Sequence, residues 1–247
     1  MKPTVSVKNY SLTLGHKEIV RNLSFEVQPG EVFAFLGANG SGKTSTIRSL
    51  LGLYEVTKGE ALVNGRRYTA KDAQSVGYLP EERGLYTRVS AIDNLIYFGE
   101  MKGMSRAEAR KVGIEFLTEV GLADKATLKL KKLSGGQQQK VQLGAAIMGD
   151  PSLLILDEPT KGLDPVNRKL LLDIVEAHKQ QGAAVIYITH LMEEVERLAD
   201  RLLIIKNGQP EAYGTVEEVK KKFKAASIEE VFVTIYKDTS VEKKEDK

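Results

Sequence analysis

The strongest constraint on this chain is the eight-residue segment Gly37–Thr44, which reads GANGSGKT. It fits the pattern G-x-x-x-x-G-K-[ST], whose glycines let the backbone wrap around phosphate groups with its N–H groups pointing inward. A short apolar run, Glu31–Leu36, precedes this segment, and Ser45–Leu53 follows it with apolar residues at helical spacing. The succession of strand, glycine-rich loop and helix predicts a phosphate-binding loop in an α/β fold.

Two side chains of this loop have specific chemical roles. Lys43 supplies a mobile positive charge for the β- and γ-phosphates, so we count it among the catalytic residues, and Thr44 offers a hydroxyl oxygen to Mg²⁺. The predicted nucleotide-binding residues of the loop are Gly37, Ala38, Asn39, Gly40, Ser41, Gly42, Lys43, Thr44 and Ser45.

A second motif, LLILDEP, occupies Leu153–Pro159. Its four apolar residues place Asp157 at the C-terminal end of a buried strand, where open α/β sheets bind ligands. Asp157 would then hold Mg²⁺ through water, and Glu158 would position or deprotonate the attacking water. Taken alone, the pair could equally be a strand end that meets solvent. The phosphate loop earlier in the chain favours the catalytic interpretation.

Composition excludes several other classes of protein. The chain has 247 residues, a formal charge of +3 and no cysteine. A disulfide scaffold and thiol chemistry are therefore excluded, and the charge is too small to indicate nucleic-acid binding. The longest apolar runs fall well short of the ~20 residues that a membrane helix needs, and the N-terminus lacks the apolar segment of a signal peptide. We expect a chain that reaches a membrane only through a partner.

Periodicity predicts strands through the first 36 residues, with a tight turn at Gly15-His16 and a later hairpin over Ala61–Tyr68. Further strands are expected at Leu153–Leu156, Ala184–Thr189 and Leu202–Lys206, and helices between them at Asn167–Gln181 and Leu191–Ala199. Near-continuous apolar strands that alternate with helices indicate a parallel sheet covered on both faces.

Residues 85–149 read as a helical insertion, in which Ser105 and Glu108 form a capping box. Another cap at Thr215 starts a helix through Lys222. The segment SIEEVFVTIY that follows fits helix or strand equally, and residues 237–247 are expected to fray. His16 and His178 are predicted to be surface residues.

The segment Leu133–Gln137 reads LSGGQ and lies within the helical insertion. The phosphate loop, LSGGQ, LLILDEP, the triplet GLD ending at Asp164, and His190 occur in one order along the chain. This set resembles the ATP-binding subunit of ABC transporters over about residues 3–225. The resemblance implies a P-loop NTPase core with a mainly parallel sheet, an N-terminal antiparallel β subdomain and an inserted helical signature subdomain. It also implies an ATPase domain over residues 1–225, with the insertion at about 85–149, and a charged, partly frayed C-terminal extension over 226–247.

In the family that this chain resembles, two ATPase subunits pair head to tail around two ATP molecules. The resemblance implies that the signature residues of one chain close over the ATP held by the other, that Asp164 links the two sites, and that His190 contacts the γ-phosphate as a catalytic residue. A Ser-Gly-Gly turn that opens a helix is also a natural anion site. The signature residues expected at the nucleotide are Ser134, Gly135, Gly136 and Gln137.

Two positions depart from the family pattern. The family commonly stacks an aromatic ring on adenine just before the glycine that aligns with Gly15, and this position holds Leu14, which we include among the nucleotide-binding residues. Tyr10 is not given that role. Family members also place a glutamine where Glu81 stands. Glu81 can still offer an oxygen to Mg²⁺, so it joins Thr44 and Asp157 as a predicted metal ligand, although a plain surface acid is the alternative.

The resemblance implies an ATPase that uses ATP and Mg²⁺, forms a homodimer on binding ATP and drives an integral membrane permease from the cytoplasmic face of the membrane. The segment near Tyr86–Phe98 would dock the permease. The runs GYLPEERGLY, GLDPVN and SIEEVF resemble the drug- and sodium-export branch.

Two other classes stay open: a soluble ABC ATPase that acts on DNA or ribosomes, and a nucleotide-gated regulator that barely hydrolyses ATP. One ATPase domain and near-neutral charge argue against the first, and Glu158 argues against the second.

Overall fold

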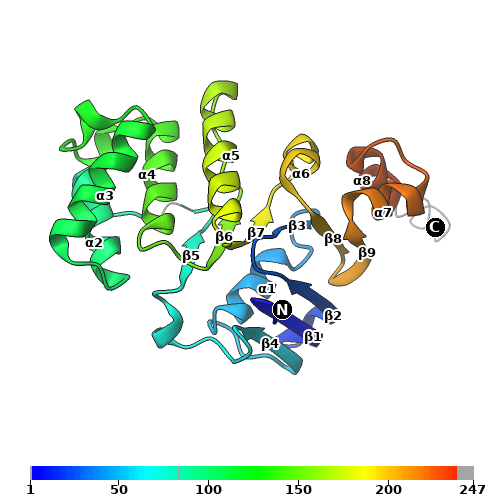
Figure 1. Ribbon diagram of the computed structural model, residues 1–247. Coiled ribbons are helices and arrows are strands. Elements are labelled where there is room, and N and C mark those ends of the chain that lie inside the picture. Colours follow the sequence, from blue (N-terminus) through cyan, green and yellow to red (C-terminus); the bar gives the residue numbers. More distant parts are fainter. Residues whose placement is uncertain (1, 83, 238–247) are drawn as a thin grey trace. The chain divides into compact units, whose positions relative to one another are not determined.

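The computed structural model describes residues 2–82 and 84–237. The chain divides into two units, one formed by Met1–Tyr68 with Tyr187–Lys247 and the other by Thr69–Ile186. Figure 1 colours the elements of both along the sequence. Within the described ranges, no helix combines the length and the apolarity that a bilayer crossing requires.

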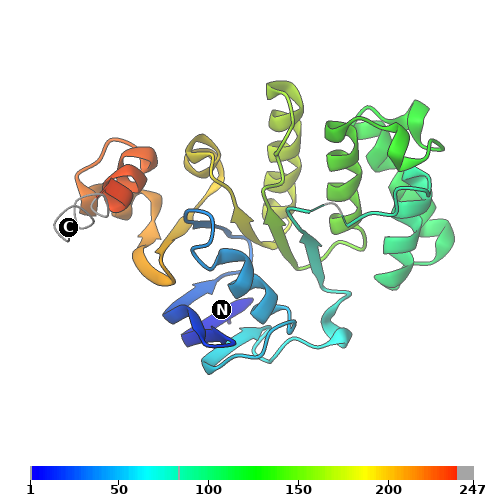
Figure 2. The same cartoon turned by 180° about the vertical axis from the view of Figure 1, so that it is seen from behind.

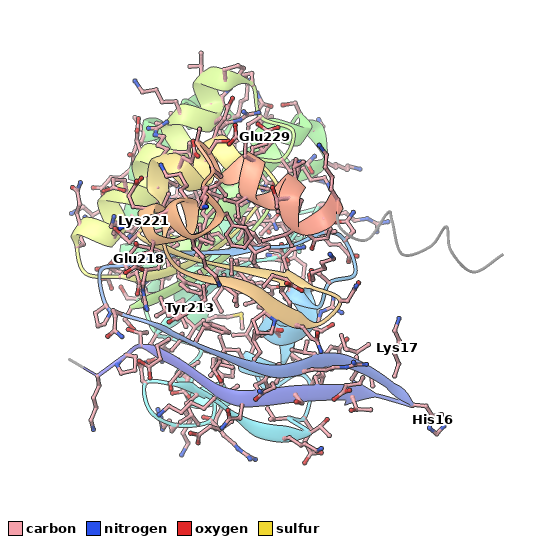
Figure 3. All side chains as sticks on the ribbon, turned by 90° about the vertical axis from the view of Figure 1, so that its right-hand side faces the viewer. His16, Lys17, Tyr213, Glu218, Lys221 and Glu229 are labelled. Atoms are coloured by element: carbon pink, nitrogen blue, oxygen red, sulfur yellow. The ribbon has the colours of Figure 1, made fainter. Side chains whose placement is uncertain are left out.

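The first unit contains an antiparallel sheet with the strand order β2-β1-β4. Its strands are β1 (Val5–Leu14), β2 (Lys17–Val27) and β4 (Lys58–Val63). The predicted turn joins β1 to β2, with Gly15 at a φ of 60° and His16 exposed at the tip of the hairpin (Figure 3). The predicted hairpin at Ala61–Tyr68 is wrong in its second strand. A tight turn follows Val63, but only Arg66 bridges back to it, because β4 pairs with β1 instead.

The same unit contains β3 (Val32–Leu36), which pairs in parallel with β8 (Arg201–Lys206), and β8 pairs antiparallel with β9 (Gln209–Thr215). Every residue of β3 is buried. Strand β9 was not predicted, because its sequence QPEAYGT is poor in β-forming residues and holds a proline. It lies at the end of the strand order, where a proline is tolerated. The helices of this unit are α1 (Lys43–Leu50), α6 (Met192–Leu198), α7 (Val216–Phe223) and α8 (Ile228–Lys237).

The second unit contains β5 (Val76–Leu79), β6 (Leu153–Asp157) and most of β7 (Ala184–Ile188), which are consecutive in one sheet. Strands β5 and β6 are parallel. Four-residue β5 is too short for periodicity to reveal. The helices are α2 (Ala91–Met101), α3 (Arg106–Glu119), α4 (Gly135–Ile147) and α5 (Pro165–Gln180). Helices α2, α3 and α4 lie side by side, which confirms the predicted helical segment (Figures 1 and 2). Short 3₁₀ turns occupy Ala70–Asp72, Ala123–Lys125 and Leu130–Lys132.

His178 was predicted at the surface, but its side chain is only 16% exposed, and burial lowers its pKa despite the nearby Asp150 carboxylate. The prediction failed because the histidine lies in the last turn of α5 beside residues distant in sequence. The frayed end expected over 237–247 lies, apart from Lys237, outside the described residues.

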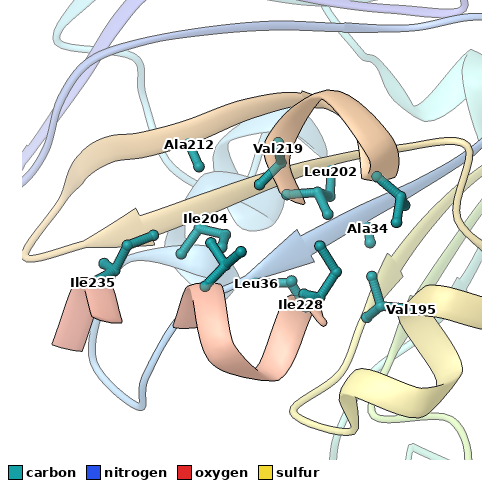
Figure 4. Packing of buried hydrophobic residues seen from close by; sticks show 11 residues of the cluster. Ala34, Leu36, Val195, Leu202, Ile204, Ala212, Val219, Ile228 and Ile235 are labelled. Atoms are coloured by element: carbon teal, nitrogen blue, oxygen red, sulfur yellow. The ribbon is translucent and has the colours of Figure 1, made fainter. Parts of the chain in front are cut away.

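The ambiguous segment after Ala225 is helical. Its residues Ile228, Val231 and Ile235 are buried at helical spacing, and they pack against Ala34 and Leu36 of β3 and the apolar face of β8 (Figure 4). The predicted capping box that starts α7 at Thr215 is confirmed.

Candidate nucleotide site

The phosphate loop leaves the buried strand β3 and enters α1 within six residues. Gly40 and Gly42 have φ values of 78° and 109°, in the region that residues with a side chain rarely adopt. A Cβ atom on Gly37 would lie 2.5 Å from the carbonyl oxygen of Ile205, and one on Gly42 would lie 2.9 Å from the side chain of Val20. Glycine is therefore required by backbone conformation at two positions and by close packing at Gly37.

Hydrogen bonds within the loop give it a definite shape. The amide of Ser41 donates to the carbonyl of Ala38 at 3.1 Å, and the amide of Gly208 donates to the carbonyl of Ser41 at 3.1 Å. The ammonium of Lys43 donates to the carbonyl oxygens of Gly37 at 2.7 Å and of Ala38 at 3.2 Å. The Lys43 ammonium thus lies over the loop, where it can exchange these carbonyl acceptors for a phosphate oxygen.

The start of α1 suits an anion. Its N-cap is Gly42, no side chain of the described residues caps it, and its first turn holds no acidic residue. The amide groups of a first helical turn have no partner within the helix, and the helix dipole adds positive potential there. The buried hydroxyl of Ser41 also finds no hydrogen-bond partner among the described residues. These donors fit the phosphates of a nucleotide.

The carboxylate pair lies in the second unit, at the end of β6. Asp157 is the last residue of the strand and is 3% exposed. Glu158 follows with a φ of 51°, a left-handed conformation that costs a residue with a Cβ about 1–2 kcal/mol. The turn is closed by a bond from the Lys161 amide to the Glu158 carbonyl at 3.1 Å, and Gln139 of α4 donates to the carbonyl of Pro159 at 2.9 Å. The fold therefore holds Glu158 in a strained backbone conformation directly after a buried acid.

The signature residues open helix α4. Ser134 is its N-cap, and the side chains of Ser134 and Gln137 each bond the backbone of the other in a capping box. Gly136 packs close to Leu163, whose Cδ2 would lie 3.2 Å from an added Cβ atom. Asp164 caps the next helix, α5, by accepting the Asn167 amide, and this bond lowers the pKa of its carboxyl group. The signature segment and Asp164 therefore both lie at the start of a helix.

Glu81 lies in the loop after β5 and forms an ion pair with Lys161 at 2.8 Å. The bond and the charge of Glu81 raise the pKa of Lys161. Both side chains are at least half exposed. Sequence reasoning missed Lys161, because its partner lies 80 residues away and no local pattern joins the two.

The remaining predicted residues lie in the first unit. Leu14 ends β1 with 36% of its surface exposed, and His190 is exposed just after β7. Tyr10 is fully buried and donates from its hydroxyl to Ser49 at 2.8 Å, so it is a core residue. The candidate site residues thus fall on both units. The first holds the phosphate loop, Leu14 and His190, and the second holds Glu81, Asp157, Glu158, the signature residues and Asp164.

An aromatic groove crosses the helical segment of the second unit, with a volume of about 530 Å³. The rings of Tyr86 and Tyr97 meet edge to face with centroids 5.2 Å apart, and both are exposed by more than two fifths. The groove is completed by Val89, Asp93, Glu100 and Arg106. Exposed aromatic surface with a polar rim is typical of a protein-binding site.

Comparison with known proteins shows which family combines the phosphate loop, the signature segment and the carboxylate pair. The sequence model of the ABC transporter family matches residues 20–161. An ABC transporter ATP-binding protein of Methanocaldococcus jannaschii is 42% identical over 222 residues, which cover 90% of this chain and 81% of that protein. The linearmycin resistance ATP-binding protein of Bacillus subtilis is 41% identical over 85% of this chain and 69% of its own length. The Nod factor export ATP-binding protein I of Burkholderia lata is 37% identical over 85% of this chain and 70% of its own length.

A solved structure of the ATP-binding subunit of an ABC transporter agrees with this fold. It superposes with a TM-score of 0.87 at 30% identity and covers 94% of this chain and 98% of its own. The match includes the mixed sheet, the antiparallel N-terminal sheet and the helices, so the predicted P-loop NTPase fold is confirmed. The phosphate loop therefore stands in a nucleotide-binding fold, and this chain belongs to the family of ABC transporter ATP-binding proteins.

Proposed function

We propose that this chain is the ATP-hydrolysing subunit of an ABC exporter, in which two copies pair around two ATP molecules and drive a separate membrane-spanning partner. The proposal of hydrolysis is supported by the left-handed backbone conformation of Glu158, which directly follows the buried Asp157. Strained backbone persists where the fold over-determines it, and such residues cluster at active sites. Glu158 would orient and deprotonate the water that attacks the γ-phosphate.

ATP would be held from two chains. The loop amides and Lys43 would bind the β- and γ-phosphates, which the uncapped start of α1 supports. Ser134 and the amides of Gly135 and Gly136 would bind the γ-phosphate held by the other chain. Gln137 would support this contact from the capping box, Asp164 would link the two sites, and His190 would contact the γ-phosphate.

The proposed Mg²⁺ ligands are the Thr44 hydroxyl and the carboxylates of Asp157 and Glu81. Hard oxygen donors of this kind suit Mg²⁺, which keeps several waters and binds phosphate oxygens as well. When bound, the ion would neutralise charge that develops on the phosphates. The ion pair between Oε1 of Glu81 and Lys161 would compete with this role.

The partner would dock on the aromatic groove around Tyr86 and Tyr97. Its exposed rings offer the contact area that interfaces use, and Arg106 with Asp93 and Glu100 supplies a polar rim. Relatives named for linearmycin resistance and Nod factor export favour outward transport. The chain would then work at the cytoplasmic face of the membrane, held there by its partner.

Nucleotide selection should be relaxed, because Leu14 replaces the aromatic ring expected on adenine. Base stacking on an aromatic side chain contributes roughly 1–3 kcal/mol, which this chain forgoes. We expect measurable GTP hydrolysis beside ATP hydrolysis, and we expect Leu14→Tyr to lower the KM for both nucleotides, because either base can stack on the added ring. Phosphate release with each nucleotide tests this, and strict ATP dependence of the wild type would contradict it.

The proposed function is tested by purifying tagged Glu158→Gln from gently solubilised native membranes in the presence of ATP and Mg²⁺. A multi-helix membrane protein should co-purify in a fixed ratio. The matched variant carries Tyr97→Glu as well, which places a charge in the aromatic groove far in sequence from the motifs. It should still bind ATP and lose the membrane protein. Recovery of the homodimer alone, or of ribosomes or DNA, would contradict the exporter assignment.

A further inference from the structure

In the part of the chain that the structure describes, helix α8 meets the phosphate loop at the hydroxyl group of Tyr236. We propose that Tyr236 is a positioning residue for this loop, through which α8 sets the affinity for nucleotide. The inference rests on the proposed function, since it assumes that the loop binds ATP. Its basis is a set of contacts within the first unit.

Helix α8 is fixed against the strand that carries the loop. Ile228, Val231 and Ile235 are no more than 6% exposed and pack in one cluster with Ala34 and Leu36 (Figure 4). Leu36 directly precedes the loop. At the other end of the helix, the Ile228 amide donates to Glu196 of α6 at 2.7 Å. A helix buried in this way is a rigid support from which a side chain can act.

The hydroxyl of Tyr236 makes two hydrogen bonds at the loop. It accepts the amide of Ala38 at 2.7 Å and donates to the carbonyl of Ile205 at 2.8 Å. Burial raises the pKa of this hydroxyl, an effect that the Ala38 bond opposes, so it stays protonated and can donate at neutral pH. Ile205 is also the residue whose carbonyl lies against Gly37. Tyr236 therefore ties Ala38, the second residue of the loop, to Ile205 of β8.

The ring of Tyr236 is itself held in place. It stacks on Phe232 with centroids 4.5 Å apart and planes 27° apart. The ammonium of Lys206 lies 5.7 Å from the ring centroid and also donates to the carbonyl of Ile235 at 2.5 Å. These contacts fix the position of the Tyr236 hydroxyl, so the hydroxyl can determine the position of the Ala38 amide that it accepts.

Ala38 connects Tyr236 to the residue that binds phosphate. Its amide bonds Tyr236, while its carbonyl accepts from both Ser41 and Lys43. The Ala38 amide shares its peptide group with the Gly37 carbonyl, which accepts from Lys43 at 2.7 Å. A shift of that peptide group would therefore move an acceptor that holds the Lys43 ammonium. Small displacements of groups that position a substrate have large effects on binding and rate. The hydroxyl of Tyr236 thus pre-organises the loop for nucleotide.

The test is Tyr236→Phe, which removes the hydroxyl and keeps the ring, its stack on Phe232 and its contact with Lys206. We expect the dissociation constant for ATP and the KM to rise about 3- to 10-fold, the effect of one hydrogen bond, with kcat at saturating ATP within twofold of wild type. Amide hydrogen exchange at Ala38 should also accelerate. Isothermal titration with ATP, steady-state kinetics and exchange measured by mass spectrometry give the three readouts.

The matched control is Tyr213→Phe on β9, which also removes a tyrosine hydroxyl that hydrogen-bonds within the first unit, here to Arg201 at 2.8 Å. It should leave nucleotide affinity and exchange at Ala38 unchanged. Unchanged affinity in Tyr236→Phe, or an equal loss in both variants, would overturn the inference while wild type still binds ATP. Failure of the wild type to bind ATP would instead overturn the proposed function.

Discussion

Replacing Glu158 by glutamine is expected to lower ATP turnover by about 10²- to 10⁴-fold, the usual contribution of a general base. Glutamine keeps the size and the hydrogen-bonding reach of the side chain but cannot accept the proton of the attacking water. Glu158 lies after buried Asp157 in a left-handed backbone conformation. Glutamine at this position would adopt the same conformation. ATP affinity should therefore remain close to that of wild type.

Phosphate release under steady-state conditions measures the first effect, and titration with ATP measures the second. Glu115→Gln makes the same chemical change on the exposed face of α3 and should leave turnover unaltered. Equal turnover in wild type and Glu158→Gln would contradict the catalytic role. If both were equally slow, the nucleotide-gated regulator would become the better description of this chain.

The second large effect is expected from Lys43→Ala. The Lys43 ammonium now lies on the carbonyl oxygens of Gly37 and Ala38, from which it can reach a phosphate oxygen. Hydrogen bonds to a charged group contribute about 1.5–3 kcal/mol, so ATP affinity should fall about 10- to 100-fold. Turnover should fall with it, because the same charge stabilises the transferring phosphoryl group.

Titration with ATP and the shift of the melting temperature with ATP both report this loss. Lys169→Ala removes an exposed lysine from α5 and should bind ATP as wild type does. Wild-type affinity in Lys43→Ala would show that the loop does not hold the nucleotide as proposed.

Features specified by neighbouring residues were predictable from the sequence. The run before Gly37 and the run before Asp157 are continuous apolar segments that end at functional residues, and both proved to be fully buried strands. The helix starts at Ser105 and Thr215 were predictable because an N-cap residue and its partner lie within four residues of each other. Patterns of this kind depend little on the rest of the fold.

Features specified by distant partners were not predictable. Strand β9 forms because β8 offers an edge, although its own sequence is a poor strand former. Helix α8 is rich in β-branched residues, and its helical state is favoured by the cluster that buries Ile228, Val231 and Ile235. The Glu81 ion pair with Lys161 likewise joins residues that no sequence window contains together.

The candidate site shows the same division. Residue types and spacing predicted the chemistry of the phosphate loop and of Asp157 with Glu158. The left-handed conformation of Glu158 and the contact between Tyr236 and Ala38 required the structure, because both depend on how the chain closes around them.

The proposed function depends on a head-to-tail arrangement, in which the phosphate loop of one chain and the signature residues of another hold each ATP. This arrangement is tested by mixing two inactive variants, Lys43→Ala and Ser134→Arg. A head-to-tail heterodimer of the two combines one intact loop with one intact signature segment, so ATP hydrolysis should reappear in the mixture. No recovery of hydrolysis in a mixture shown to contain the heterodimer would contradict this arrangement.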